Sequence, residues 1–284
     1  NGAAASRGFK RDFHDIVTEH DLRCEEIART VLAAQVPGCR IVGEEGGVAA
    51  GSADARVTFY VDPIDGTSNF AAGLPLYCVS IGAQVDGATV AGVVRMPALG
   101  LEVYGDDQVA HVQRHLPDGR PFGSPVRLGG SVERTESECL VATSFPNVVD
   151  LAWDREGCLG LYGEISDRVG GIRSIGAGAI ELAMVALGRL DATFGTRTQP
   201  WDIAAGMHLV RLAGGSATHL PMDAPEGTAP VDQPGYLAVA PGRSVPGLES
   251  LLDELQERRR MQDPRLTQDP RLTQERRLTQ ERHS

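Results

Sequence analysis

One short run constrains the fold of this chain more than any other, because it joins a strand directly to a turn and a helix start. Val57 to Val61 is rich in β-forming residues, and Asp62-Pro63-Ile64-Asp65-Gly66-Thr67-Ser68-Asn69-Phe70 follows it at once. Proline has no N–H for a sheet ladder, so we expect the strand to end at Asp62-Pro63. The Gly-Thr-Ser turn that comes next could open a helix.

The two carboxylates of this run, Asp62 and Asp65, lie three residues apart. Carboxylates held so close repel each other and are hard to keep ionised unless a divalent cation lies between them. Oxygen ligands of this kind suit Mg²⁺ or Mn²⁺ rather than zinc. The amides of Gly66, Thr67 and Ser68 at a helix start would bind an anion such as phosphate. The pattern therefore favours metal-assisted phosphoryl chemistry.

Two further acidic elements lie far away in the sequence but fit the same kind of site. Gly43-Glu44-Glu45 ends a short apolar strand that starts at Arg40, and Trp201-Asp202-Ile203 places a carboxylate at a helix start. Each also has an ordinary structural interpretation. Asp202 could simply cap its helix, and Glu44-Glu45 could be a solvated loop.

The remaining pattern predicts a layered α/β or α+β protein with a sheet-rich first half and a mixed second half. Asp86-Gly87 is a hairpin signal between two β-type runs. The predicted helices are Glu19 to Ala34, Ala177 to Leu187, Ile203 to Leu212 and Pro246 to Arg259. The predicted strands are Tyr77 to Val85, Thr89 to Met96, Leu101 to Tyr104, Val109 to Gln113, Asp191 to Phe194 and Tyr236 to Ala240, and Glu138 to Ser144 begins a second segment with a different rhythm.

The change of rhythm near residue 138 suggests a division of the chain into three parts. We predict an N-terminal α+β subdomain over 1–137 that binds metal and phosphate, and a C-terminal α/β subdomain over 138–260. Residues 261–284 form a low-complexity tail in which QDPRLT occurs twice and QERRLT once. A period of six matches neither helix nor strand, so we expect a disordered tail, with a docking segment as the alternative.

Composition excludes several classes of protein. The 284 residues carry 27 basic and 38 acidic side chains, a formal net charge of −11, which argues against binding to nucleic acid or an anionic membrane. No apolar run is long enough to span a bilayer, and the first ten residues lack the apolar block of a secretory signal. Five cysteines without a C-x-x-C pair fit a reducing cytoplasm, so we expect a cytoplasmic protein.

Together these motifs resemble the inositol monophosphatase family of metal-dependent, lithium-sensitive phosphatases. The resemblance runs from Lys10, the only lysine, to about Ala240. Its parts are Asp15-Ile16-Val17-Thr18 with Asp21, the Gly-Glu-Glu triplet, the run from Asp62, Gly171-Ile172-Arg173-Ser174 with Gly176-Ala177-Gly178, and Trp201 to Gly206. The resemblance implies an αβαβα sandwich like that of fructose bisphosphatases, and a homodimer.

Carried over residue by residue, the resemblance implies two or three Mg²⁺ ions per site, with Mn²⁺ as an alternative. Glu44, Asp62 and the Ile64 carbonyl would hold the first ion. Asp62, Asp65 and Asp202 would hold the second, and Glu45 would help a third, weaker position through water. Thr67 and Asp21 would orient and deprotonate the attacking water, as two-metal hydrolysis requires. Lys10 matches a lysine that lies near the site in this family.

The substrate side of the site is implied in the same way. The amides of Gly66, Thr67 and Ser68 would cradle the phosphate. Asp65, Asp202 and the backbone of Gly176, Ala177 and Gly178 would face the substrate hydroxyls. Gly176-Ala177-Gly178 is not a dinucleotide loop, because the third glycine is absent and Glu181 stands there instead.

The sequence departs from the family pattern in two places. Family members commonly have a glutamate seven residues before the Trp-Asp aspartate, and here that position is Gly195, followed closely by Arg197. We expect this exchange to remove a specific acceptor for inositol and to open a wider, more basic pocket. Family members usually also have a full helix before the lysine, and we expect that helix to be missing or trimmed here.

The sequence therefore predicts a Mg²⁺-dependent phosphomonoesterase acting on a small polyhydroxylated phosphate ester, such as an inositol, cyclitol or sugar phosphate. One alternative keeps the chemistry and changes the substrate to a nucleotide, a nucleoside bisphosphate or a histidinol-type phosphate. An alternative of another class is a non-catalytic metal-binding interaction protein whose tail recruits a partner.

Overall fold

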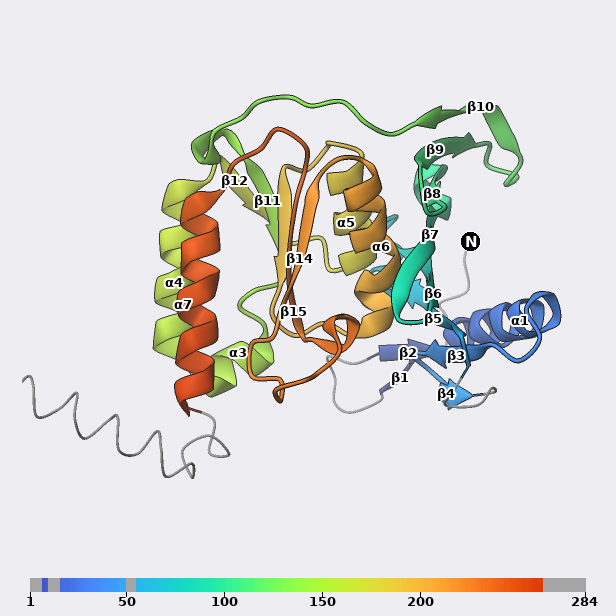
Figure 1. The fold of residues 1–284 in the computed structure, drawn as a ribbon, viewed down its shortest axis with the longest axis horizontal. Helices are drawn as coiled ribbons and strands as arrows, with labels where there is room; N and C mark the ends of the chain where they lie inside the picture. Colours follow the sequence, from blue (N-terminus) through green and yellow to red (C-terminus); the bar gives the residue numbers. More distant parts are fainter. Residues whose placement is uncertain (1–6, 10–15, 50–54, 263–284) are drawn as a thin grey trace, which may run out of the picture.

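The computed structural model describes residues 7–9, 16–49 and 55–262. Five layers follow one another across the molecule (Figure 1). Their order is the helices α4 (Arg155–Arg168) and α7 (Pro246–Gln262), a five-stranded sheet, the helices α5 (Gly178–Ala186) and α6 (Pro200–Leu212), an eight-stranded sheet, and the helix α1 (Glu19–Gln35). The predicted αβαβα sandwich is confirmed.

The eight-stranded sheet is antiparallel except for one parallel pair, β3 and β5. Its spatial order is β10 (Pro121–Arg127), β9 (Ala110–His115), β8 (Leu101–Gly105), β7 (Ala88–Met96), β6 (Cys78–Val85), β5 (Val57–Asp65), β3 (Arg40–Gly43) and β4 (Gly47–Ala49). The hairpin expected at Asp86-Gly87 is present, and both residues have positive φ, of 51° and 84°. A two-residue turn with that geometry matches the twist of the strands that it joins.

The five-stranded sheet is mixed. Its order is β12 (Gly171–Arg173), β11 (Leu140–Thr143), β13 (Ala192–Gly195), β15 (Gly235–Val239) and β14 (Ser216–Leu220). The pairs that involve β11 are parallel and those that involve β15 are antiparallel. The short elements are β1 (Arg7–Phe9), β2 (Ile16–Thr18), α2 (Thr67–Ala72), α3 (Val148–Trp153) and the 3₁₀ turns Pro97–Leu99, Glu136–Glu138 and Pro230–Asp232.

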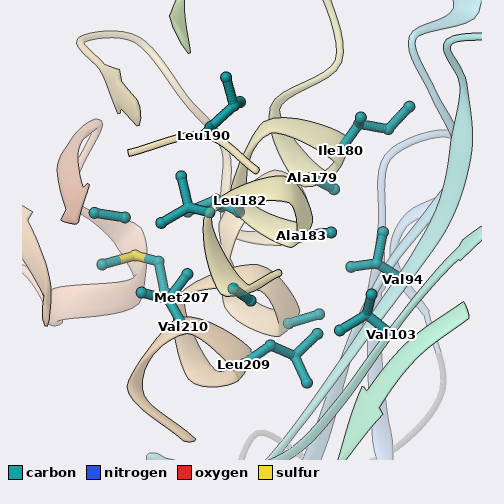
Figure 2. Packing of buried hydrophobic residues seen from close by; sticks show 14 of the residues in the cluster. Val94, Val103, Ala179, Ile180, Leu182, Ala183, Leu190, Met207, Leu209 and Val210 are labelled. Carbon is teal, nitrogen blue, oxygen red and sulfur yellow. The ribbon is translucent and has the colours of Figure 1, made fainter. Parts of the chain in front are cut away.

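The main core lies where α5 and α6 pack between the two sheets. Leu182 and Met207 from these helices, with Val94 and Val103 from the eight-stranded sheet, are all fully buried, and Figure 2 shows them in one continuous cluster. Because both faces of this helical layer are covered by a sheet, its residues must be apolar or small on nearly every side. The layer therefore joins the two sheets through one shared core.

The backbone corrects the predicted end of one strand. Pro63 does not stop β5, which continues to Asp65. The ladder with β6 instead becomes irregular between the pairs Asp62–Ser80 and Asp65–Cys78, so the proline lies where no ladder hydrogen bond is required of it. This irregularity is the point at which the two carboxylates leave the regular sheet.

Other predictions stand or change as follows. The five cysteines are free, and all but Cys24 are buried, as expected of small core residues. The tail begins later than predicted, because α7 continues to Gln262, and the rest of the tail lies outside the described residues. The division near residue 138 falls between the last strand of one sheet and the first strand of the other, and it remains a prediction.

In the described part of the chain no helix combines the length and the apolar character needed to cross a membrane.

Candidate active site

The end of β5 brings two carboxylates into the interior. Asp62 is 2% exposed and Asp65 is 8% exposed. The Ile64 amide donates to Asp62 Oδ1 at 3.0 Å, which bends the chain around the first carboxylate. A single buried strand therefore delivers both acids and the intervening Ile64 carbonyl to one place.

Acids from two other segments surround Asp62. Burial is the largest cause that raises the pKa of Asp62 well above its ordinary value, and the charges of Asp65, Glu44 and Asp202 raise it further. A hydrogen bond with Glu44 adds to the effect. Four of the five acids predicted to bind metal, all but Glu45, therefore come together, although Glu44 follows β3 and Asp202 lies in the first turn of α6.

Asp65 is tied to the start of α5. Its Oδ2 accepts from the Ala179 amide at 2.8 Å and from the Cys78 thiol at 3.5 Å. Burial raises the pKa of Asp65 to about 6, against the opposing effect of these donors. The carboxylate therefore connects the β5 turn with the segment Gly176-Ala177-Gly178, which was predicted to face the substrate.

Asp202 lies further into α6 than a helix cap, at the third residue of the helix. The N-cap of α6 is Gln199, whose backbone amide donates to Asp202 Oδ2 at 2.8 Å. Asp202 is thus the third residue of the helix and part of a capping box. The interpretation as a plain N-cap is wrong, and the helix start holds Asp202 where its charge acts on Asp62.

Thr67 and Asp21 meet beside the acids. Thr67 Oγ1 lies 3.3 Å from Asp21 Oδ1 and 3.0 Å from the Ile64 carbonyl oxygen. A hydroxyl has one proton, so Thr67 donates to one of these acceptors at a time and keeps a lone pair for another donor. Asp21 is fully buried on α1. The predicted water-orienting pair is therefore assembled from residues 46 positions apart.

The turn before α2 depends on a glycine. Gly66 has φ of 86°, and a side chain there would meet the Leu76 carbonyl oxygen at 2.8 Å and Ala177 at 3.1 Å. Gly66 thus lies directly against the predicted substrate segment, where Gly176 also has positive φ. Ser68 is exposed at the start of the six-residue helix α2.

Two residues that the sequence analysis missed hold these loops. Glu25 on α1 accepts from the amides of Glu45 and Gly46 at 2.7 and 2.8 Å, so it shapes the loop that carries Glu44. Asn69 donates to the carbonyls of Leu76 and Ile175 at 2.8 and 2.9 Å, which joins α2 to the approach to α5. Asn69 lies inside the motif that starts at Asp62, but its role depends on a contact 106 residues away.

A residue of α7 holds the loop that precedes Asp202. Arg259 on α7 donates to the Thr196 carbonyl at 3.0 Å and forms an ion pair with Asp150, and both side chains are almost fully buried. Thr196 also donates to Asp150. This cluster of Arg259, Asp150 and Thr196 anchors the segment that leads into α6.

Two expectations about the pocket change. Gly195 does not open space, because a side chain there would meet Tyr236 at 2.6 Å and Thr198 at 2.7 Å, so neighbouring side chains already fill the volume. Arg197 forms an ion pair with Asp223, with both carboxylate oxygens 2.9 Å from Nη1. Lys10 lies outside the described residues.

The donor set fits a hard divalent cation. It consists of carboxylate oxygens and the Ile64 carbonyl oxygen, which are ligands that Mg²⁺ prefers. Among the described residues, no three acid, histidine or cysteine side chains lie close enough together to hold a metal ion as they stand. Burial is the main cause that raises the pKa values of Asp62 and Asp65, and neighbouring acids raise both further, so a positive charge between them would lower both.

Comparison with known proteins now identifies the family. Residues 2–256 match the family model described as the inositol monophosphatase family. The chain belongs to the inositol monophosphatase family. An inositol-1-monophosphatase SuhB of Mycobacterium tuberculosis is 42% identical over 204 residues, which are 70% of this chain and 67% of that protein.

Solved structures of similar proteins share the fold. The structure of Mycobacterium tuberculosis SuhB superposes with a TM-score of 0.65 at 33% identity, covering 83% of this chain and 84% of that one. An IMPase/NADP phosphatase complexed with Mg²⁺ and phosphate superposes with a TM-score of 0.70 over 88% of this chain and 85% of that one. At 19% identity the second likeness concerns the inositol monophosphatase fold alone.

Proposed function

We propose that this protein is a Mg²⁺-dependent phosphomonoesterase that hydrolyses a small polyhydroxylated phosphate ester. The observation that carries the proposal is the meeting of Glu44, Asp65 and Asp202 around the buried Asp62. Four acids held close together in the interior destabilise the folded protein unless a cation neutralises their charge. Family membership and the relatives named as inositol-1-monophosphatases support the same chemistry.

The metal-binding roles follow from the donor set. Glu44, Asp62 and the Ile64 carbonyl would hold one Mg²⁺, and Asp62, Asp65 and Asp202 a second. Glu45 would support a third through water, and Mn²⁺ would suit the same oxygens. When bound, the cations lower the pKa of the attacking water and offset the charge on the departing oxygen.

The residues of the chain would handle the proton of the attacking water. Asp21 is the general base, and the Thr67 hydroxyl orients the water, because the two side chains lie 3.3 Å apart beside the Ile64 carbonyl. The proton ends on Asp21 Oδ1. Lys10, as its position in the motif implies, would add a positive charge near the site.

The substrate would be held from two sides. The amides of Gly66, Thr67 and Ser68 would bind the phosphate, and Asp65, Asp202 and the backbone from Gly176 to Gly178 would face the hydroxyl groups. Arg197, whose charge is offset by Asp223, lies next to the anchored loop and would contact the substrate's far end.

A phosphate-release assay tests this function. Inositol phosphate, sugar phosphates and nucleotide esters are compared with Mg²⁺, without Mg²⁺, and with Mg²⁺ plus Li⁺. We expect release that requires Mg²⁺, is inhibited by Li⁺ and is highest for polyhydroxylated esters. Higher rates on nucleotides or histidinol phosphate would select the alternative substrate classes. No release from any ester would leave the non-catalytic metal-binding protein as the better description.

The assembly and location are part of the same proposal. We infer a cytoplasmic homodimer that binds neither nucleic acid nor membrane. Free cysteines support the location, and the acidic balance of −11 supports the lack of binding to nucleic acid or membrane. The dimer is what membership of the family implies. Light scattering on the purified protein tests the dimer, and a monomer at micromolar concentration would contradict it.

A further inference from the structure

A cavity of ≈540 Å³ lies at the opposite end of α6 from the acid cluster. Asp202 is in the first turn of this helix, whereas His208 and Arg211, which line the cavity, are in its last turns. Asp202 and Arg211 are nine positions apart on the helix, which corresponds to a rise of about 13 Å. None of the five acids proposed to bind metal lines the cavity.

The floor of the cavity is a polar row that crosses four strands. Arg40 pairs with Thr58, Thr58 with Gln84, and Gln84 with Thr89, so all four side chains lie on one face of the sheet. Gln84 Nε2 donates to Thr89 Oγ1 at 3.2 Å. All four residues line the cavity.

A mainly apolar row, of which Tyr60 also lines the cavity, lies between this floor and the acids. Two positions along the same strands, Val42 and Tyr60 pack with Ala204 of α6. The sheet face therefore changes from apolar to polar where the helix ends. The polar groups of this row that are not paired within it can be matched by solvent or by a ligand that forms hydrogen bonds.

The roof is built from histidine and arginine. Arg211 donates through Nη2 and Nε to the Ala217 carbonyl, at 2.6 and 3.1 Å, which fixes its guanidinium. His208 Nε2 lies 2.6 Å from the Asp106 carbonyl oxygen. His219 of β14 and the 3₁₀ turn Pro230–Asp232 close the other side.

Two nitrogens at this cavity are buried without a partner. They are Arg40 Nε and His219 Nδ1, neither of which has a hydrogen-bond partner in the described part of the chain. A buried donor left unmatched costs about 1–3 kcal/mol. An oxygen acceptor in the cavity would recover that cost.

The charge of the lining is positive. The lining contains two arginines, Arg40 and Arg211, and one acid, Asp232. It also contains Arg56, which is already paired with Asp86 at 2.9 Å. The cavity volume is within the range of sites for small metabolites and exceeds what a bare phosphate ion fills. Threonine and glutamine side chains on the floor can bind hydroxyl groups.

We propose that this cavity is a second binding site, distinct from the acid cluster, for a small phosphate monoester with a hydroxylated body. Arg40 and Arg211 would bind the phosphate, and the polar row would bind the hydroxyl groups. This proposal does not depend on the protein being a phosphatase.

Calorimetry with glucose 6-phosphate in EDTA tests the second site. Without divalent cations the acid cluster is negative and repels the ester, so binding reports on the cavity. We expect saturable binding at one site. Arg40→Gln should weaken it about tenfold or more, and the exposed Arg114→Gln, a matched loss of one positive charge, should leave it unchanged.

Two further measurements keep the test decisive. Circular dichroism and thermal unfolding establish that Arg40→Gln is folded, and Arg211→Gln provides a second variant. In NMR spectra, the signal of the His219 ring, assigned by its loss in His219→Gln, should shift when the ester is added. Absence of saturable binding at about 10 mM, equal affinity in Arg40→Gln, or an unshifted His219 would each overturn the proposal.

Discussion

At the scale of single residues, the site is a set of charges that the fold holds together against their repulsion. Asp62 combines near-complete burial with three acidic neighbours, and Asp65 with burial and the amides of α5. Such groups reduce the stability of the folded chain unless a cation neutralises them. Activity and stability therefore respond in opposite directions to the same substitutions.

Asp62→Asn should separate these two effects. We expect kcat to fall by a factor of about 10³ or more, because the carboxylate proposed to bind metal is lost. In EDTA the variant should unfold at a higher temperature than the wild type, because repulsion from Glu44, Asp65 and Asp202 is relieved. Phosphate release and thermal unfolding measure the two results. Retained activity would refute the metal role of Asp62.

Glu181 should make stability depend on pH. Burial raises the pKa of Glu181 from 4.5 to about 7, although Thr193 and the Ile175 amide donate to its carboxylate. The folded state then binds the proton more tightly than the unfolded state. The stabilisation is complete below pH 4.5 and is lost as pH rises to about 7, by about 3 kcal/mol at most.

Urea unfolding of Glu181→Gln at about pH 5 and about pH 8 checks this dependence. The wild type should lose stability relative to Glu181→Gln between the two pH values. Glu164→Gln, at an exposed position on α4, should follow the wild type. An equal pH dependence for wild type and Glu181→Gln would show that Glu181 is ionised throughout.

At the scale of elements, the position of α6 decides where Asp202 lies, and glycines allow that position. A side chain at Gly82 would meet Ala204 Cβ at 2.8 Å and the Ala205 amide nitrogen at 2.9 Å. Gly92 on the next strand approaches Ala205 equally closely. The helix therefore packs directly on the backbone of the sheet.

Gly82→Ala should push α6 away from the sheet. We expect a loss of stability of about 1–3 kcal/mol and a lower kcat, because Asp202 moves with the helix. Gly160→Ala is the matched control, since nothing lies within 4 Å of a side chain at that exposed position of α4. It should stabilise the protein by up to about 1 kcal/mol. Denaturant unfolding compares the two, and an unchanged Gly82→Ala would contradict this account of the packing.

The elements also show where sequence patterns were sufficient. The acids were found because two carboxylates after a β-type run constitute a local signal, and most elements that position them were predicted within a few residues. Helix α4 was missed because three glycines, at positions 157, 160 and 163, obscure its apolar spacing. Strand β10 was missed because all its residues are exposed and two are prolines.

Contacts distant in sequence were not predictable from the pattern. Glu25 and Asn69 shape the site through amides and carbonyls that belong to other segments. Tyr236 and Thr198 fill the space beside Gly195, and this packing likewise depends on the tertiary structure. A motif names the reacting groups, whereas the residues that hold them depend on how the layers assemble.

At the scale of the whole molecule, the tail can be separated from the folded part. The buried residues of α7, from Leu248 to Arg259, all precede Gln262. Ending the chain after Gln262 should therefore leave the melting temperature and kcat/KM unchanged. A loss of activity would show that the tail contributes to the site, and a partner bound only by the full chain would support the docking alternative.

The ion pair between Arg259 and Asp150 has a consequence for how the protein is made. Arg259 also holds the Thr196 carbonyl, 63 residues earlier in the chain, at the entrance to α6. A ribosome releases the chain from its N-terminus, so the acids of the first half emerge long before the clamp on the segment leading to Asp202. The segment leading to Asp202 is therefore held in place only after α7 has been made, and we expect a nascent chain without α7 to carry the acids of the first half without this clamp.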